Sequence, residues 1–248
     1  MDGTAGHHSI TVHPALAALL RGLIVSCQAR PDNPLHGSVF MAAMARAASG
    51  AGALGLRMNG PEDIRAARAA VDLPIIGLYK RPYNDCQVVI TPTFAEAEAV
   101  AACGAAVIAL DATGRRRPDG VGLEELIARI HGELGLPVLA DASGIEDGLA
   151  AEAAGADAVA TTLSGYVDPG APPPEDPDFD LVAALAARVR VPVIAEGRIK
   201  TPAQAREALD RGAFAVVVGT AITNPREIAR GFVQALAPHS GGRRTQGW

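Results

Sequence analysis

Two charged side chains stand where apolar stretches of the sequence end, and both could transfer protons. Lys80 closes the run Pro-Ile-Ile-Gly-Leu-Tyr-Lys, and Glu196 closes the run Val-Pro-Val-Ile-Ala-Glu. An amine whose pKa is lowered by burial can act as a base, as an acid or as a Schiff-base nucleophile. A carboxyl group beside it can serve as the second acid or base, or can orient the lysine. The alternative is structural: Lys80 would pair with a neighbouring carboxylate, and Glu196 would neutralise Arg57 or Arg198.

Four further polar side chains end other apolar stretches. Gln28 and Arg57 carry planar donor groups that suit a sugar hydroxyl, a carbonyl or an enolate oxygen. Asp111 and Asp141 can bind hydroxyl groups of a ligand. They can equally cap the turns that follow them, because aspartate is a preferred capping residue.

Two glycines in the last quarter of the chain would let the backbone approach an anion. Gly197-Arg198 and Gly219-Thr220 each follow an apolar stretch. Backbone N–H groups at such turns form phosphate sites in many barrel enzymes, and glycine leaves room for the phosphate. We expect a phosphate cradle at these two turns, with ordinary turn glycines as the alternative.

Two other segments leave two interpretations each. The Arg115–Arg117 run can bind an anionic ligand or can form a solvated surface. The segment 165–177, which contains Pro172–Pro174, can close over a ligand or can be an inert insertion stiffened by proline.

The elements that would position these residues recur regularly. Short runs rich in Val, Ile and Leu alternate with alanine-rich segments of helical periodicity, which is typical of buried parallel strands covered by helices. We expect strands at Leu23–Gln28, Leu54–Met58, Ile75–Lys80, Ala106–Ala112, Val138–Ala142, Ala158–Leu163, Val193–Gly197 and Ala215–Gly219. The clearest helices are expected at Pro61–Ala70, Phe94–Cys103, Leu123–Leu134, Ile145–Ala154, Pro202–Arg211 and Pro225–Leu236.

The residues before these strands also repeat. A Gly-Ala pair precedes every second strand, and a proline precedes three of the others, because glycine suits the end of a helix and proline suits a chain that must leave it. Eight such units predict an α/β fold, a (β/α)8 barrel, whose functional groups lie at the carboxyl ends of the strands. A doubly wound sheet would have fewer strands and no such repeat. The pairs begin at Gly52, Gly104, Gly155 and Gly212, and the prolines are Pro74, Pro137 and Pro192.

Composition limits the class of protein. The chain has 248 residues, 49% of them hydrophobic and 20% charged, which suits one large folded core. We expect a single barrel domain at 22–237, an N-terminal extension at 1–21 and a flexible tail at 238–248. A net charge of −5 argues against a nucleic-acid partner, and no stretch is a convincing membrane span or signal peptide.

Cysteine and histidine usage narrows the class further. The three cysteines are scattered, which favours a reducing compartment and hence the cytoplasm. The six histidines show no metal-ligand spacing, so we expect no metal and no histidine-based catalysis.

At this point the motifs resemble a known family, the N-acetylmannosamine-6-phosphate 2-epimerases. The resemblance runs in order from about Leu23 to Leu236 and touches every expected strand. It is carried by Ile24–Ala29, Arg57–Gly60 with Asp63-Ile64, Pro74–Gly77 with Lys80-Arg81, Ile90–Thr93, Ile108–Thr113, Ala140-Asp141, Thr161–Tyr166, Ile194–Ile199, and Val217–Gly219 with Ala221–Thr223.

The resemblance implies a phosphate-binding (β/α)8 TIM barrel, usually dimeric, with no metal or redox cofactor. It implies an isomerase that inverts carbon 2 of N-acetylmannosamine 6-phosphate, a small-molecule sugar phosphate, during sialic acid breakdown. By position, the family's catalytic lysine and glutamate correspond to Lys80 and Glu196. Its substrate contacts correspond to Gln28, Arg57 and Asp141.

Two places depart from the family pattern, and one of them is Ala142-Ser143-Gly144 after the fifth expected strand. The other bears on the phosphate. The family has Gly-Ala-Ile-Thr-Arg-Pro at the last turn, with an arginine that binds the phosphate, whereas this chain has Asn224 there. Arg198, a helix N-terminus near Asn224 or the Arg115–Arg117 run could compensate for the lost guanidinium. Otherwise the substrate is a different or unphosphorylated amino sugar.

Three other functions compete with an epimerase. A Schiff-base aldolase would use Lys80 as its nucleophile, and a non-catalytic sugar-phosphate-binding barrel would follow if Asn224 signalled decay. A flavin or nicotinamide oxidoreductase on a similar barrel has no positive support from the sequence.

Overall fold

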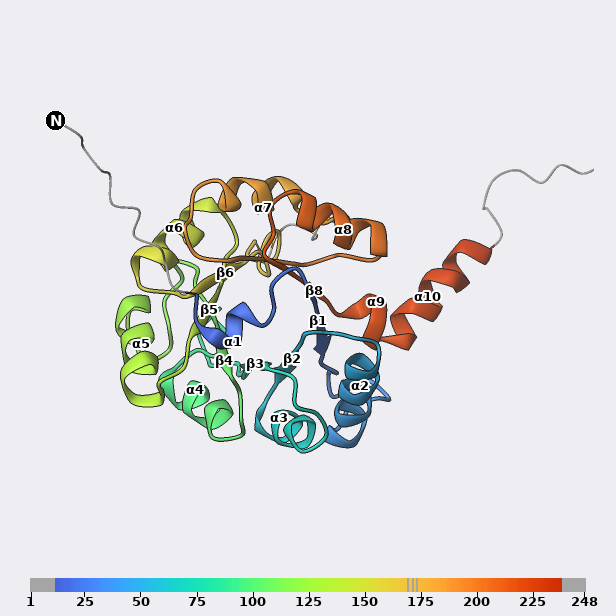
Figure 1. Ribbon diagram of the computed structural model, residues 1–248, viewed down its shortest axis with the longest axis horizontal. Helices are drawn as coiled ribbons and strands as arrows, with labels where there is room; N and C mark the ends of the chain where they lie inside the picture. The colour runs from blue at the N-terminus through green and yellow to red at the C-terminus, as the bar shows by residue number, and fades with distance from the viewer. Residues whose placement is uncertain (1–11, 169, 171, 173, 238–248) are drawn as a thin grey trace, which may run out of the picture.

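The computed structural model describes residues 12–168, 170, 172 and 174–237 and contains a closed barrel of parallel strands. The strands join in sequence order, and β8 pairs with β1 to close the ring (Figure 1), so the expected eight-stranded barrel is confirmed. The expected tail at 238–248 and the first eleven residues of the N-terminal extension lie outside the described residues. The strands are β1 Leu23–Cys27, β2 Gly55–Asn59, β3 Ile75–Leu78, β4 Val107–Asp111, β5 Val138–Asp141, β6 Ala158–Ala160, β7 Val193–Glu196 and β8 Ala215–Val218.

Helices surround this barrel (Figure 1), and the helices expected from periodicity are present, each ending within two residues of the expected position. None of the described helices combines the length and the apolar character needed to cross a membrane. The helices are α1 Pro14–Ala17, α2 Ser38–Gly50, α3 Pro61–Arg68, α4 Phe94–Ala101, α5 Leu123–Arg129 continued by a π-helical turn at Ile130–Leu134, α6 Ile145–Ala153, α7 Phe179–Ala186, α8 Pro202–Asp210, α9 Thr220–Thr223 and α10 Pro225–Leu236.

The repeated Gly-Ala pairs end four helices in the same way. Each glycine has a φ between +88° and +99°, a left-handed conformation that only glycine adopts at little cost. The alanine after it donates its N–H to a carbonyl five residues earlier, as in Ala53 to Ala48 and Ala156 to Ala151. This bond satisfies a carbonyl that the helix end would leave unpaired, and it turns the chain directly into the next strand.

The three prolines lie where a missing N–H does no harm. Pro74, Pro137 and Pro192 each precede a strand and accept a ladder hydrogen bond with their carbonyl oxygen, at 2.9–3.0 Å. Because proline cannot donate, it suits this entry position and no position further inside a buried parallel sheet.

Alternation along the strands separates two cores. Side chains such as Ile24, Ile76 and Val107 point into the barrel, whereas Val25 and Ile75 point outward against the helices. The inward positions continue upward in steps of two residues. At the carboxyl end of each strand, the last residue of this inward series therefore faces the mouth of the barrel.

The chain leaves the sheet earlier than expected at two strands. β3 ends at Leu78 and β6 ends at Ala160, whereas the sequence pattern predicted strands as far as Lys80 and Leu163. After β3 the backbone of Lys80 pairs antiparallel with Ile90, so the segment between them forms a projecting loop rather than a longer strand. The functional residues on these strands thus stand just beyond the sheet, at its upper rim.

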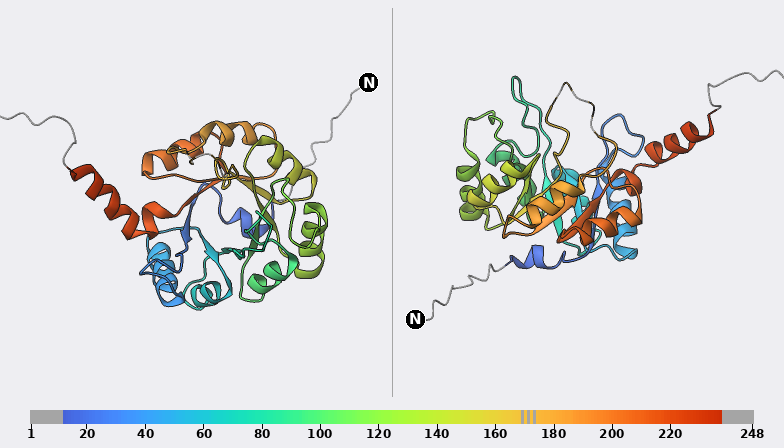
Figure 2. Two further views of the ribbon diagram at one scale, coloured as in Figure 1. Left: turned by 180° about the vertical axis from the view of Figure 1, so that it is seen from behind. Right: turned by 90° about the horizontal axis from the view of Figure 1, so that it is seen from above.

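The opposite end of the barrel is closed by α1 and the turn that follows it. Figure 2 shows α1 at one end of the barrel and the long loops at the other. Leu16 and Leu19 are fully buried and belong to the interior core. Gly55 makes room for Leu19, because a Cβ atom at this position would lie 2.5 Å from the Leu19 side chain. Residues 16 and 19 of the expected N-terminal extension therefore plug the floor of the barrel.

We expect Leu16→Ala to lower the free energy of unfolding by about 2–5 kcal/mol, because it leaves a cavity in the barrel floor. Urea denaturation measures this change. Leu20→Ala is the matched control: its side chain is 54% exposed, so the loss should stay within about 0.5 kcal/mol. Equal losses in the two variants would contradict the role of Leu16 as a plug.

Candidate active site

Six polar side chains meet at the carboxyl end of the barrel, each from a different strand. The inward parity of the strands brings them together, as expected for five of the six. Because the strands below them are filled with apolar side chains, the polar groups form a single layer that faces the mouth. The six are Gln28 after β1, Arg57 on β2, Lys80 after β3, Asp141 on β5, Thr162 after β6 and Glu196 on β7.

A buried ion pair forms the base of this layer. The Arg57 guanidinium binds the Asp141 carboxylate with two contacts, Nη1 to Oδ1 at 3.0 Å and Nη2 to Oδ2 at 2.6 Å. The side chains of Arg57 and Asp141 are 1% and 0% exposed. Burial alone would lower the pKa of Arg57, but the charges of Asp141 and Glu196 outweigh it and raise the pKa. Arg57 is therefore a fixed positive charge in the site.

Glu196 is a second carboxyl beside the same guanidinium. Its Oε2 lies 2.9 Å from Arg57 Nη1, and its side chain is 14% exposed. Burial raises the pKa of Glu196, and the negative charge of Asp141 raises it further, against the opposing effects of Arg57 and Lys80. Since Asp141 already neutralises Arg57, Glu196 can hold a proton at a pH where an ordinary glutamate would be ionised.

Lys80 reaches the layer from the opposite side of the mouth. Its Nζ donates to Gln28 Oε1 at 2.8 Å, and the Gln28 amide in turn donates to Ser26 Oγ at 3.0 Å. Withdrawal from water among the rim residues lowers the pKa of Lys80, and the nearby charge of Arg57 lowers it further. The side chain remains accessible from the mouth, so a bound ligand would displace more water and strengthen this effect.

The two turns that we expected to form a phosphate cradle follow β7 and β8. Gly197 has a φ of +117° and Arg198 a φ of +60°, so the backbone bends sharply there. Gly219 precedes α9, and a Cβ atom on it would lie 3.2 Å from Ser26, so the end of β8 passes close to β1. Thr220 begins α9 and is exposed. The two turns are close neighbours, because β7 and β8 are paired.

Asn224 has a structural role at the start of α10. Its Oδ1 accepts the Glu227 N–H at 3.4 Å, which caps the helix, and accepts from Asn33 Nδ2 at 3.2 Å. Arg226 fastens the same two segments, because its guanidinium binds the Asp32 carboxylate at 3.0 Å. The loop after β1 is thereby held against the beginning of α10.

Arg198 is turned away from the cradle. Its guanidinium donates to the main-chain oxygens of Ser164 and Asp176 and lies 5.4 Å from the Tyr166 ring centre. It ties the loop after β7 to the loop after β6, which includes part of the segment 165–177. This placement gives no support to Arg198 as the replacement for the missing guanidinium.

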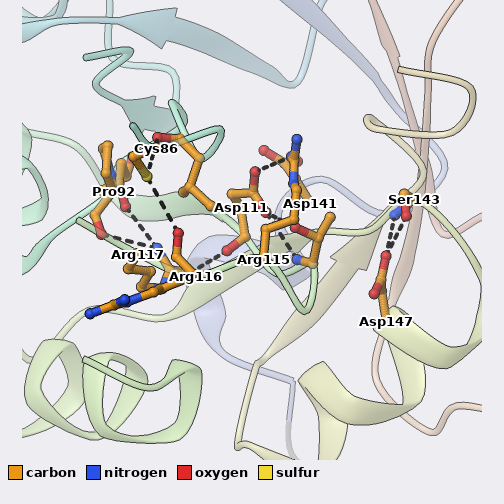
Figure 3. Close-up of polar contacts among 12 residues, drawn as sticks. Cys86, Pro92, Asp111, Arg115, Arg116, Arg117, Asp141, Ser143 and Asp147 are labelled. Atoms are coloured by element: carbon orange, nitrogen blue, oxygen red, sulfur yellow. Dashed lines mark hydrogen bonds and ion pairs between the residues drawn. The ribbon is translucent and has the colours of Figure 1, made fainter. Parts of the chain in front are cut away.

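Arg115 and Arg117 of the Arg115–Arg117 run make local contacts, whereas the exposed Arg116 side chain has no hydrogen bond among the described residues (Figure 3). Arg115 binds the Asp111 carboxylate at 2.7 Å, and the buried Arg117 donates to the main-chain oxygens of Pro92 and Asp111. Asp111 also accepts from the N–H of Thr113 at 2.9 Å. It therefore caps the turn that follows β4, which is one of the two roles that the sequence allowed. β4 lies across the ring from β8, so this run is far from the cradle.

Thr162 is a site residue that the sequence analysis did not single out. Its Oγ1 lies 2.6 Å from Asp141 Oδ1 and 3.2 Å from Glu196 Oε2. The alternation along β6 could have revealed it, because Ala158 and Ala160 face the barrel interior and Thr162 is the next residue in this series. Arg30 was also missed: it is exposed on the loop after β1, and its charge helps to lower the pKa of Lys80.

His, Cys, Asp and Glu side chains of the described segments form no cluster suited to a metal ion. The positive charge in the layer comes instead from Arg57 and Lys80. Such a set of groups can take up and release protons on a small polar ligand at the mouth.

The fold and the site define a (β/α)8 barrel with a lysine and two carboxyl groups at its mouth. A family model described as "Putative N-acetylmannosamine-6-phosphate epimerase" matches residues 41–238. The chain therefore belongs to the N-acetylmannosamine-6-phosphate 2-epimerase family.

Individual relatives agree with this assignment. Proteins of the same name from Thermosynechococcus vestitus and Caldanaerobacter subterraneus are 50% and 49% identical over 222 and 216 residues. These matches cover 89% and 87% of this chain, and 96% and 91% of the relatives. The solved structure of the N-acetylmannosamine-6-phosphate 2-epimerase from Clostridium perfringens is 43% identical, with a TM-score of 0.86, and the match covers 94% of this chain and 100% of that one.

More distant solved structures share the fold alone. A thiamine phosphate pyrophosphorylase from Pyrococcus furiosus is 20% identical, with a TM-score of 0.55 over 90% of this chain and 100% of that one. The comparisons favour none of the alternatives, whether aldolase, binding barrel or oxidoreductase.

We expect Asp141→Asn to lower the free energy of unfolding by about 1–3 kcal/mol, because Arg57 loses a charged hydrogen-bond partner although Glu196 can ionise and neutralise it. Urea denaturation at neutral pH measures the loss. Asp72→Asn is the control: Asp72 pairs with Arg68 in solvent, and its replacement should cause no measurable change. A stable Asp141→Asn protein would show that the buried pair is not essential to the barrel.

Proposed function

We propose that this protein inverts carbon 2 of N-acetylmannosamine 6-phosphate and so produces N-acetylglucosamine 6-phosphate. One observation carries the proposal. A lysine with a lowered pKa and a carboxyl group with a raised pKa share one mouth above a fixed positive charge. The names of relatives at 43–50% identity support the same reaction and substrate.

The chemistry requires both kinds of group. The carbon 2 proton becomes acidic only after the sugar ring opens and exposes the aldehyde at carbon 1. The neutral Lys80 amine removes that proton and becomes an ammonium, and the electron pair moves onto the aldehyde oxygen to form an enolate. In ring opening the protonated Glu196 gives a proton to the ring oxygen, and the anomeric hydroxyl returns its own proton to the Glu196 carboxylate. The Arg57 charge favours the enolate. Glu196 then gives its proton to the opposite face of carbon 2, which completes the inversion, and the Lys80 ammonium returns a proton to Glu196 through the solvent.

The other layer residues prepare the site. Gln28 accepts from the Lys80 amine and so holds it at the mouth. Arg57 and Asp141 are the family's substrate contacts by position, and their deep burial makes them a fixed polar floor under the sugar. The proposal needs no metal and no redox cofactor, because only protons move.

For the phosphate group we propose the backbone around Gly197, Gly219 and Thr220, with Arg30 as the cation that Asn224 cannot supply. The loop after β1 is fastened to the start of α10 through Asn33 and Asn224. Arg30 stands on this loop, exposed and without a side-chain hydrogen bond among the described residues. It can therefore turn toward an anion above β1 and β8.

We also propose that the protein is a homodimer joined by α10. This helix has no buried residue and projects from the barrel (Figures 1 and 2). Phe232, Val233 and Leu236 on it are 67%, 68% and 84% exposed, which is unusual for large apolar side chains. In a (β/α)8 barrel the last helix normally covers the last strand.

A groove at that vacant place fits the same helix from a second copy. It runs beside α8 at the edge of β8 and β1, and Leu23, Ala205 and Leu209 line it. Reciprocal placement of α10 would bury its apolar face on both copies and complete both barrels, which is a symmetric interface.

We propose that the protein acts in the cytoplasm, which the three scattered cysteines support. We also propose that its substrate comes from sialic acid breakdown, which the family resemblance supports.

The first experiment follows conversion of N-acetylmannosamine 6-phosphate by proton NMR. We expect the wild-type protein to form the gluco epimer. Lys80→Met and Glu196→Gln should each lower kcat by about 10²-fold or more, because each removes an acid–base group. Lys200→Met, which changes the other lysine of the chain, should retain activity. Conversion by Lys80→Met at the wild-type rate would contradict the proposal.

The phosphate proposal has its own test. Arg30→Met should raise KM for the phosphorylated sugar about tenfold or more, with a much smaller effect on kcat, because it removes a charged contact. The control Arg188→Met changes an exposed arginine that precedes β7, at the opposite end of the barrel, and should leave KM unchanged. Higher kcat/KM for unphosphorylated N-acetylmannosamine than for its phosphate would instead mean that Asn224 has changed the specificity.

The dimer is tested by light scattering after gel filtration at micromolar concentration. We expect a dimer for the wild-type chain and a monomer for Phe232→Glu, because a charge on the apolar face opposes burial. Gln234→Glu adds the same charge elsewhere on the helix and should remain dimeric. A monomeric wild-type protein would refute the arrangement.

A further inference from the structure

Thr91 follows the projecting loop that begins after Lys80, and its backbone is strained. Its φ is +45°, in the left-handed region that a β-branched residue adopts only at a cost in free energy. The residue is also fully buried. Strain of this kind persists only where the surrounding contacts require it. The contacts of Thr91 must therefore outweigh its strain.

The hydroxyl of Thr91 joins two strands. Its Oγ1 accepts the N–H of Tyr79 at 3.1 Å and donates to the carbonyl oxygen of Ala109 at 2.6 Å. Both directions are fixed, because an N–H can only donate and a carbonyl oxygen can only accept. Tyr79 is the first residue after β3, and Ala109 lies in the middle of β4. One side chain thus connects the end of β3 to β4.

The segment of Ile90 and Thr91 replaces the pairing of these strands near the mouth. β3 and β4 pair directly over two positions, both below Tyr79. Above them, the Thr91 N–H donates to the Tyr79 carbonyl oxygen at 3.0 Å, and the Asp111 N–H donates to the Ile90 carbonyl oxygen at 3.0 Å. The segment therefore lies between the chain that leaves β3 and the end of β4.

The backbone of Lys80 is held by the same insertion. Lys80 comes directly after Tyr79 and pairs antiparallel with Ile90. Its N–H donates to Asn59 Oδ1, at the end of β2, at 2.7 Å. With its backbone fixed on both sides, its Nζ reaches Gln28 Oε1 at 2.8 Å.

We propose that Thr91 is a positioning residue for Lys80: its hydroxyl fixes the backbone at Tyr79 and so holds the Lys80 amine beside Gln28 at the mouth. Because Thr91 is fully buried, it acts through the backbone and not through contact with a ligand. The use of Lys80 as a base rests on the proposed function. The position of its amine rests on the contacts described above.

Arg117 holds the strained turn from the other side. Its buried guanidinium donates through Nη1 to the carbonyl oxygens of Thr91 and Pro92, at 3.4 and 3.2 Å. Its Nη2 donates to the carbonyl oxygen of Asp111, the last residue of β4. The turn is thereby tied to β4 twice, once by the Thr91 hydroxyl and once by Arg117.

The position of the amine controls its protonation. Withdrawal from water lowers the pKa of Lys80, and the positive charges of Arg57 and Arg30 lower it further, against the opposing charges of Glu196 and Asp141. A lysine with a freer backbone could turn its flexible side chain into water, where its pKa would return toward the ordinary value. An amine held at the rim therefore loses its proton at a lower pH than an exposed lysine.

The test is a carbon-13 NMR titration of the lysine ε-carbons in the free protein. The chain has two lysines, and Lys200→Met assigns their resonances by removing one of them. We expect Thr91→Val to decrease the acid dissociation constant of Lys80 about tenfold, because the amine gains access to water. Thr91→Ser retains the hydroxyl and should titrate like the wild type.

Two further variants separate positioning from stability. Thr91→Gly lacks the hydroxyl but adopts the positive φ without strain, so relief of strain offsets part of the lost hydrogen bonding. It should change the Lys80 titration in the same direction as Thr91→Val, and it supplies the answer if Thr91→Val does not fold. Leu16→Ala weakens the floor at the opposite end of the barrel and should leave the Lys80 titration unchanged.

An unchanged Lys80 titration in the variants that lack the hydroxyl would overturn the proposal, as would a shift in Thr91→Ser equal to that in Thr91→Val. The titration needs no substrate, so its result stands whether or not N-acetylmannosamine 6-phosphate is converted. In the conversion assay we expect Thr91→Val to lower kcat about tenfold or more with little change in KM, because the base is displaced from carbon 2. Thr91→Ser should restore kcat.

Discussion

The buried guanidinium of Arg57 is the constraint on which the rest of the site depends. A positive charge with 1% exposure inside an apolar barrel requires a negative partner, and Asp141 supplies it with two hydrogen bonds. Glu196 is then a surplus carboxyl group and Lys80 an amine that faces a cation. One proton is left to be shared between them, which is the requirement for exchanging a proton with a substrate.

Most of the fold could be predicted because local rules agree with the global architecture. Gly52 and its three counterparts end helices with a positive φ, and Pro74 and its two counterparts begin strands, so the repeat is visible in the sequence. The inward parity of the strands then placed Gln28, Arg57, Lys80, Asp141 and Glu196 in one layer. Thr162 also faces the barrel axis, but nothing in the sequence distinguishes it from a threonine in an ordinary turn.

Other features depend on contacts that no local pattern contains. Arg198 comes after a glycine at the end of a strand, where a phosphate ligand is expected. Its guanidinium instead donates to the main-chain oxygens of Ser164 and Asp176. Asn224 replaces an arginine and acts as a helix cap joined to Asn33. The helical periodicity of Pro225–Leu236 was evident, but periodicity does not say what its apolar face packs against. Each outcome depends on segments that are distant in sequence.

Exchange of the carbon 2 hydrogen with solvent is the most direct test of proton transfer at this site. N-acetylmannosamine 6-phosphate is incubated with the protein in deuterated water, and the carbon 2 proton is followed by NMR. We expect deuterium at carbon 2 of the gluco product with the wild-type protein, and neither exchange nor product with Lys80→Met. Product that keeps its original hydrogen, or undiminished exchange in Lys80→Met, would contradict proton transfer by Lys80.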